Sequence, residues 1–210
     1  MGDLDFMSFV QSYYQKTLEK YGPTPQGVDW NGCESQNLRF QIQHNMVKSG
    51  YSSKTHILDY GCGYGEFAHF LSNDEYLGKY TGFDIVPESI NYAMKRFVDH
   101  NKFDFTNKLS SDSRFDTIFA SGVFNIHPGD SPKWLNLHVK KCLFEMSKMS
   151  DVVVLNFLKS NPTKPVSNLF FVSQDELKSI LPADFQITNI NDDYGLWEWT
   201  VVIERIGTTL

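Results

Sequence analysis

The fold is decided by one stretch, Ile57-Leu58-Asp59-Tyr60-Gly61-Cys62-Gly63-Tyr64-Gly65-Glu66-Phe67. It has the pattern of a short apolar strand that ends in an acid, a turn with glycine at every second position, and the start of a helix. Glycine is needed where the backbone takes a positive φ or approaches a ligand closely. The first turn of the following helix offers backbone N–H groups without a helical acceptor. The stretch therefore predicts a strand–turn–helix unit that binds a polar group.

Downstream of this stretch, short apolar strands alternate with amphipathic helices. Strands are predicted over 55–60, 79–84, 115–122 and 151–158, and helices from about Glu66, over 87–100 and over 132–149. Pro87 suits a first helical turn, where its missing N–H costs nothing. Such alternation implies right-handed βαβ crossovers and a parallel sheet that is covered on both faces.

The C-terminal part departs from this alternation. A Pro- and Asn-containing loop over 159–166 leads to a short helix, which Ser173 opens with Glu176 three residues later in a capping box. Strands are then predicted over 185–190 and 196–206, joined by only residues 191–195. So short a connection holds no crossover helix, so the two strands should be antiparallel neighbours at one edge of the sheet.

The first fifty residues have a helical pattern instead. Apolar residues recur at i, i+3 and i+4 from Phe6 to Leu18 and again from Leu38 to Val47, on either side of the Pro/Gly-rich segment 22–27. Ser35 or Glu34 could begin the second helix and Gly50 could end it. We expect a helical cap over residues 1–52 and a core over residues 53–210, within one structural domain.

Charge and hydropathy exclude several classes of protein. Nineteen basic and 25 acidic residues give a net charge of −6, which repels a nucleic-acid backbone. The longest aliphatic run, Val152 to Leu155, is far shorter than the roughly 18 to 20 apolar residues of a membrane span. The N-terminus is acidic and lacks the basic start of a signal peptide, so we expect a cytoplasmic protein.

Cysteine usage points to neither a disulfide framework nor a metal site. The three cysteines form no Cys-x-x-Cys pair and no histidine stands at zinc-finger spacing. Aromatic residues are abundant, at 15% of the chain. Aromatic side chains supply core volume or a stacking surface for a ring-bearing ligand, and composition does not separate these two uses.

The spacing of the glycines and the position of the acids narrow the ligand. Dinucleotide folds use Gly-x-Gly-x-x-Gly to seat a pyrophosphate, whereas here the third glycine comes one residue early and Asp59 precedes the first. Asp59 would repel a phosphate but not a cationic amine or sulfonium. Asp84 lies at the end of the next predicted strand, 19 residues after Gly65, where a carboxylate can accept hydrogen bonds from ribose hydroxyls.

Together these residues resemble the class I S-adenosylmethionine-dependent methyltransferases over about residues 55 to 206. The resemblance implies an α/β, Rossmann-like, doubly wound sheet of seven strands, mostly parallel with an antiparallel C-terminal strand. It implies that Asp59, Gly61, Gly63 and Gly65 surround the methionine part of S-adenosylmethionine, that Asp84 holds the ribose and that Ile85 packs on the adenine. The family's residue for the adenine amine is ambiguous here, with Asp104, Asn107 or the backbone open.

Cys62 belongs to the same cofactor-binding turn. The plain interpretation is a small side chain that fits a tight turn among glycines. The alternative is a nucleophile, because the start of a helix lowers the pKa of a thiol.

More narrowly, the chain resembles a bacterial subgroup with few defined substrates, found beside genes for surface polysaccharides and small metabolites. The segments that carry this likeness are 27–31, 34–36, 39–40, 120–125 and 193–198. The subgroup implies a small polar acceptor, such as a surface-polysaccharide or nucleotide-activated precursor.

The end of the fourth strand should supply further site residues, since α/β ligands bind at the carboxyl edge of the sheet. His127 is the candidate general base, because a neutral imidazole can take a proton from an attacking hydroxyl; an exposed loop histidine is the alternative. Ser121 and Asn125 are candidates for binding the cofactor, and Asn125 could instead position the substrate.

The cap supplies the remaining candidates. Gln36 and Arg39 form an i, i+3 pair on one helix face, and Arg39 could hold the cofactor's carboxylate in a charge-assisted pair. Tyr14, Trp30 and Phe124 are expected where the cap, the glycine turn and the strand end converge, and are candidates for substrate contact, although a core role is the alternative for each.

The sequence thus predicts an S-adenosylmethionine-dependent methyltransferase that acts on a small molecule, most simply at oxygen, as a monomer or homodimer without a metal. A nicotinamide-dependent oxidoreductase shares the strand, the glycine turn and the ribose acid, and is disfavoured by the glycine spacing and by Asp59. A cofactor-binding module without catalysis is the second alternative.

Overall fold

One sheet of seven strands organises the computed structural model, which describes residues 3–74, 76–129, 131–159 and 168–207. The strand order is β3-β2-β1-β4-β5-β7-β6. The first five strands are parallel, and β7 is antiparallel to both β5 and β6. The predicted mixed edge is therefore confirmed. The strands are β1 His56–Tyr60, β2 Lys79–Phe83, β3 Phe103–Thr106, β4 Thr117–Ala120, β5 Val152–Leu158, β6 Phe185–Asn191 and β7 Glu198–Arg205.

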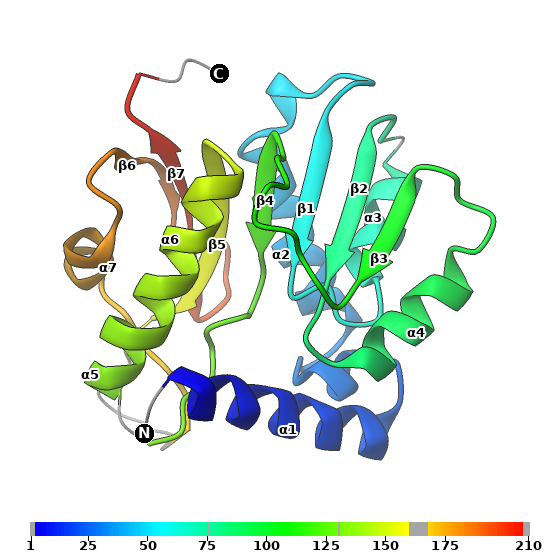
Figure 1. Cartoon of the computed structure of the whole chain (residues 1–210), viewed down its shortest axis with the longest axis horizontal. Coiled ribbons are helices and arrows are strands. Elements are labelled where there is room, and N and C mark those ends of the chain that lie inside the picture. Colours follow the sequence, from blue (N-terminus) through cyan, green and yellow to red (C-terminus); the bar gives the residue numbers. More distant parts are fainter. Residues whose placement is uncertain (1–2, 75, 130, 160–167, 208–210) are drawn as a thin grey trace.

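Two long helices come before the first strand in the chain, and helices lie in most connections between the parallel strands (Figure 1). The crossover between β3 and β4, residues 107–116, contains no helix. The crossover between β4 and β5 holds a composite helix with a π-helical turn in its middle. The loop predicted over 159–166 lies almost entirely outside the described residues. The helices are α1 Asp3–Tyr21, η1 Pro25–Val28, α2 Cys33–Asn45, η2 Lys48–Gly50, α3 Glu66–Asn73, α4 Pro87–Arg96, α5 Ser131–Lys133, η3 Trp134–Val139, α6 Lys140–Met149 and α7 Gln174–Ile180.

Two hydrophobic layers cover the sheet. On one face, α6 and α7 pack on the sheet with the start of α1; on the other face, α2 and α3 pack through Phe40 and Phe67. Figure 1 shows α6 in front of the sheet and α2 and α3 behind it. No described helix is long and apolar enough to cross a membrane.

The cap lies across the sheet edge at which the parallel strands end (Figure 1). Phe6 and Val10 of α1 pack in the same core as β4 and β5. Thr17 donates a hydrogen bond of 2.9 Å to the carbonyl of Gly27. The second cap helix begins at Cys33, not at Ser35, because Gly32 caps it and the Ser35 hydroxyl turns back to bond the Gly32 carbonyl.

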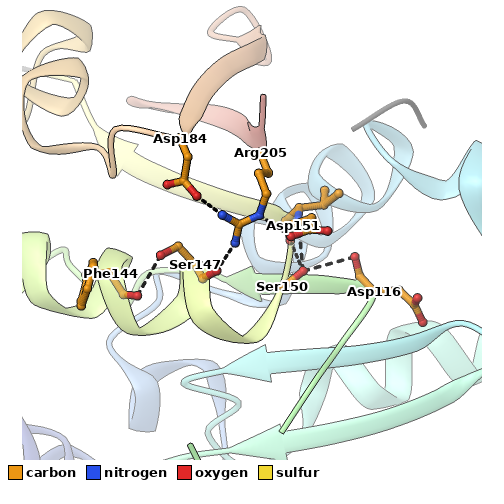
Figure 2. A network of polar contacts seen from close by, with 8 residues as sticks. Asp116, Phe144, Ser147, Ser150, Asp151, Asp184 and Arg205 are labelled. Atoms are coloured by element: carbon orange, nitrogen blue, oxygen red, sulfur yellow. Dashed lines mark hydrogen bonds and ion pairs between the residues drawn. The ribbon is translucent and has the colours of Figure 1, made fainter. Parts of the chain in front are cut away.

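The C-terminal hairpin is held to the parallel part of the sheet at the opposite edge. Arg205, at the end of β7, pairs with Asp151 before β5 and with Asp184 before β6, and donates to the Ser147 carbonyl of α6 (Figure 2). The predicted capping box of α7 is confirmed, with Ser173 and Glu176 bonded reciprocally. These contacts therefore lie at the edge of the sheet where the parallel strands begin, far from the carboxyl ends of those strands, which build the site.

Candidate functional site

The glycine turn after β1 forms the floor of the site. Gly61 has φ +85°, and a Cβ on it would lie 2.6 Å from Val123 Cγ2, so no other residue fits there. Gly65 caps α3 in the left-handed conformation. The backbone of this turn therefore lies directly against the segment that follows β4.

Asp84 ties the end of β2 to this turn. One carboxylate oxygen accepts a 2.9 Å hydrogen bond from the Gly63 amide, and the other accepts 2.8 Å from the Val86 amide. Burial raises the pKa of Asp84 from 3.8 to about 6 against these two bonds, which lower it. The carboxylate is thus fixed in position but lacks a balancing cation among the described residues.

Asp59 lies on the other side of the same turn and is 3% exposed. The Tyr80 hydroxyl donates to its carboxylate at 2.6 Å. Burial raises the pKa of Asp59 to about 7, although the Tyr80 hydrogen bond lowers it. Among the ion pairs that the described residues form, none includes Asp59 or Asp84.

Two cavities open around the turn. The larger is lined by residues that include Asp84, Ile85, His138 and Cys142. The smaller is lined by residues that include Gln36 and Asp59. Five residues line both cavities and mark what we call the junction between them: Val28, Trp30, Gly61, Gly63 and Ser121.

The lining of both cavities is apolar and acidic. No lysine or arginine is among the described residues that line either one. At the junction, the buried hydroxyl of Ser121 makes no hydrogen bond to the described part of the chain. An orphaned hydroxyl and two unbalanced acids favour a ligand that is cationic and polar at this point.

Trp30 closes the junction from the cap side. A Cβ at Gly122 would lie 2.5 Å from Cζ2 of Trp30, so the indole rests on bare backbone. The Arg39 guanidinium stacks on the same indole at 3.9 Å from the ring centroid. Arg39 Nε in turn lies 2.7 Å and 2.8 Å from the carboxylate oxygens of Glu198, which is fully buried at the start of β7.

This buried pair changes the predicted role of Arg39. Glu198 already neutralises the guanidinium, and Arg39 lines neither cavity. We therefore see Arg39 as the residue that fixes Trp30 and α2 over the site, in place of the predicted clamp on a cofactor carboxylate. Glu198 stands 159 residues away in the chain, which is why no local pattern indicates the pair.

Most of the other predicted site residues are brought together. Tyr14, Trp30, Gly61, Gly63, Asp84, Ile85 and Ser121 line the larger cavity, and Gln36, Asp59 and Cys62 line the smaller. Four further predicted residues, besides Arg39, line neither: Gly65, Phe124, Asn125 and His127.

Phe124 and His127 are set differently from the prediction. The β4 strand ends at Ala120 and the chain turns at Gly122, which sends the Phe124 ring into the core, where it stacks on Phe157. His127 is buried, and its Nδ1 accepts a 3.0 Å hydrogen bond from the Gly129 amide. In a neutral imidazole that accepts at Nδ1, the proton sits on Nε2. The predicted role of His127 as the general base stays a prediction.

Residues that the sequence did not single out complete the larger cavity. Met7 and Val10 come from α1, Tyr60 from the end of β1, and His138 and Cys142 from the composite helix before β5. Asn156, buried on β5, accepts a 2.7 Å hydrogen bond from the Gly122 amide and so holds the turn under Trp30. The i, i+4 spacing of His138 and Cys142 was the one available signal, and it also fits ordinary core packing.

The strand order, the acid before the glycine turn and the second acid after β2 define the class I methyltransferase fold with its ligand cleft at the carboxyl edge. The chain belongs to the methyltransferase domain family, whose family model matches residues 51–179.

Individual relatives agree with this family. The Mycobacterium tuberculosis (strain ATCC 25618 / H37Rv) protein named "Putative methyltransferase Rv1506c" is 27% identical over 153 residues, which are 71% of this chain and 92% of the relative. The N-methyltransferase NodS from Bradyrhizobium japonicum WM9, solved with S-adenosylhomocysteine, superposes with a TM-score of 0.71 at 15% identity over 94% of this chain and 98% of its own. Magnesium protoporphyrin IX methyltransferase from Synechocystis PCC 6803, solved with bound S-adenosylmethionine, gives a TM-score of 0.65 at 14% identity over 95% and 96%. At these identities the two structures show a shared fold.

Proposed function

We propose that the chain transfers the sulfonium methyl group of S-adenosylmethionine to an oxygen atom of a small acceptor. The observation that carries the proposal is a pair of acids, the buried Asp59 and the half-buried Asp84, which line two neighbouring cavities without a balancing cation among the described residues. S-Adenosylmethionine carries a sulfonium and an ammonium group against one carboxylate, so its net charge is positive, and it has ribose hydroxyls that a carboxylate can bind. Its net positive charge and its hydroxyls match this site.

The two cavities suggest how the donor lies. We place its methionine part in the smaller cavity, with Asp59 and Gln36, and its ribose and adenine in the larger one, with Asp84 and Ile85. The sulfonium then falls at the junction beside Gly61 and Ser121. The Ser121 hydroxyl gains a partner there that no described residue provides.

The chemistry is an in-line displacement. The donor supplies a methyl group whose bonding electron pair stays on sulfur, while the acceptor oxygen forms the new bond and gives up its proton to a base. Holding the two reactants together in a closed site provides most of the rate. Trp30, fixed by Arg39 and Glu198, is the residue of this chain that excludes water from the junction.

The acceptor class rests on the sequence resemblance, which points to a surface-polysaccharide or nucleotide-activated precursor in the cytoplasm. The described lining holds no lysine or arginine to balance a phosphate. This lining favours an acceptor without phosphate over a nucleotide-activated one.

The nicotinamide-dependent oxidoreductase fits the site less well, because a pyrophosphate would lie beside Asp59 and Asp84 with no described cation to offset the like charges. A binding module without turnover would keep the same affinity for the donor and release no product.

The test compares ligands and variants by calorimetry. We expect S-adenosylhomocysteine to bind the wild-type chain and NADPH not to bind. Asp84→Ala should lose about 1.5–3 kcal/mol of that affinity, the contribution of hydrogen bonds to a charged group. Asp116→Ala, at an exposed acid outside both cavities, is the matched control. Binding of NADPH alone, or equal affinity in Asp84→Ala, would refute the assignment.

A further inference from the structure

We propose that the part of the larger cavity lined by Met7, Val10, Tyr60, Phe83, Val123, His138 and Cys142 is the acceptor site. We call it the inner chamber, and we infer that it takes a flat, uncharged ring that carries a hydroxyl group. The inference rests on the proposed methyl transfer from S-adenosylmethionine. It replaces the polysaccharide precursor, to which the sequence resemblance points, with an acceptor class set by the lining of the chamber, and it names the binding residues.

The residues that line the two cavities give the first reason. A sulfonium carries three substituents: the aminoalkyl chain, the adenosyl group and the methyl group. The lining likewise includes three polar side chains besides the shared junction of Gly61 and Ser121: Asp59 in the smaller cavity, and Asp84 and His138 in the larger one. The two acids suit the aminoalkyl and adenosyl groups, so His138 is left for the methyl group's acceptor.

The lining of the inner chamber sets the chemical class. Tyr60 and Phe83 present two rings with centroids 4.9 Å apart, and Met7, Val10 and Val123 add apolar surface. No described residue of this set carries a formal charge apart from the titratable His138. A sugar or a phosphate would bury its hydroxyls or charged oxygens there without enough hydrogen-bond partners, whereas a flat apolar ring would gain from burial.

A short polar chain runs along one wall of the inner chamber. The Tyr60 hydroxyl lies 4.0 Å from Cys142 Sγ, and Cys142 Sγ lies 3.8 Å from His138 Nε2. These weak sulfur contacts can yield to a better partner. A hydroxyl on the bound ring could then donate to His138, whose neutral imidazole has one acceptor nitrogen.

The backbone and the aromatic neighbours hold His138 in place. Its ring stacks on Trp134 with centroids 4.1 Å apart and an interplanar angle of 28°. Both residues lie on the π-helical turn η3 Trp134–Val139, and such turns occur often at functional sites. His138 is therefore the imidazole that faces the larger cavity, whereas His127 lines neither cavity.

The first test titrates 2-naphthol, a flat neutral ring with one hydroxyl, into the chain saturated with S-adenosylhomocysteine, and follows its fluorescence. Cys142→Phe fills the inner chamber and should weaken naphthol binding at least tenfold while the affinity for S-adenosylhomocysteine stays within twofold. Leu137→Phe, on the exposed side of the same helix, is the matched control and should change neither. Val10→Phe fills the chamber from α1 and serves if Cys142→Phe does not fold.

Three outcomes would overturn the proposal: no saturable naphthol binding to the wild-type chain, equal binding in the filled variants, or a parallel loss of S-adenosylhomocysteine affinity. The last result would mean that the inner chamber holds the adenosyl group. A wild-type chain that binds no S-adenosylhomocysteine refutes the proposed function instead, and the naphthol titration without it still tests the inner chamber.

The second test isolates His138. The wild-type chain should bind 2-naphthol about 2- to 10-fold more tightly than naphthalene, the usual contribution of one hydrogen bond. In His138→Phe, which keeps a ring against Trp134 but has no nitrogen, this preference should vanish. An unchanged preference would remove His138 from the acceptor site.

Discussion

Replacing Asp59 with asparagine should make the unliganded chain more stable and its complex with S-adenosylmethionine weaker. The asparagine amide would keep an oxygen to accept the 2.6 Å hydrogen bond from Tyr80, so the change removes charge and little else. In the wild-type chain, burial moves the pKa of Asp59 from 3.8 to about 7. At about 1.4 kcal/mol per pH unit, this corresponds to a cost of up to about 4 kcal/mol for the ionised carboxylate.

The sign follows from proton binding. The folded chain holds a proton on Asp59 between about pH 4 and pH 7, where the unfolded chain has released it, so the stability of the wild-type chain falls as the pH rises through this window. Asparagine does not titrate. Asp59→Asn and the wild-type chain should therefore have similar stability near pH 4, and the variant should be more stable by about 1–4 kcal/mol at pH 8.

Urea unfolding at pH 4.5, 6 and 8, followed by tryptophan fluorescence, measures this difference. Asp116→Asn makes the same change at an exposed carboxylate that accepts a hydrogen bond from the His56 amide, and is the matched control. Calorimetry should show that the wild-type chain binds S-adenosylmethionine more tightly as the pH rises from 5 to 8, and that this rise is smaller in Asp59→Asn, where Asp84, with its pKa of about 6, still ionises. A variant that is less stable than the wild-type chain at pH 8 would refute the claim that Asp59 is an unbalanced buried acid.

Three other predictions concern the contacts that hold Trp30 over the site and the glycine turn after β1. Arg39→Ala leaves Glu198 buried without its partner and should cost about 3–5 kcal/mol in urea unfolding, whereas a cost below about 1 kcal/mol would show that the pair is not buried. Gly122→Ala must displace Trp30, so S-adenosylhomocysteine affinity should fall at least tenfold in calorimetry, and an unchanged affinity would remove Trp30 from the site. Burial raises the pKa of the Cys62 thiol well above its usual value, so iodoacetamide should modify Cys62 far more slowly than a free thiol at pH 7.5; rapid modification, seen by mass spectrometry, would restore the nucleophile interpretation.

The strand pattern and the connection lengths are local signals, and they predicted most of the fold. The short predicted connection between the last two strands, residues 191–195, was enough to predict the antiparallel hairpin, because no crossover helix fits in it. The glycine turn and the acids at 59 and 84 are likewise close in the sequence. Asp59 and Asp84 come together because they lie at the ends of β1 and β2, which are adjacent, parallel and end at the same edge of the sheet.

What the sequence could not supply depends on tertiary packing. The Arg39–Glu198 pair joins α2 to β7, and no periodicity links residues so far apart. The hydrogen bond from the Gly129 amide to His127 cannot be inferred from the position of the histidine in the chain. His138 and Cys142 fit a buried helix face as well as a cavity wall, and only the cavity distinguishes the two.

The most direct test is a crystal structure of the chain with S-adenosylhomocysteine. We predict its ribose hydroxyls within hydrogen-bond distance of the Asp84 carboxylate, its amino group in the smaller cavity with Asp59, and its sulfur at the junction beside Ser121 and Gly61. The inner chamber of His138 and Cys142 should stay clear of the ligand. A ligand bound outside the two cavities, or one whose adenine fills the inner chamber, would contradict the assignment of donor and acceptor sites.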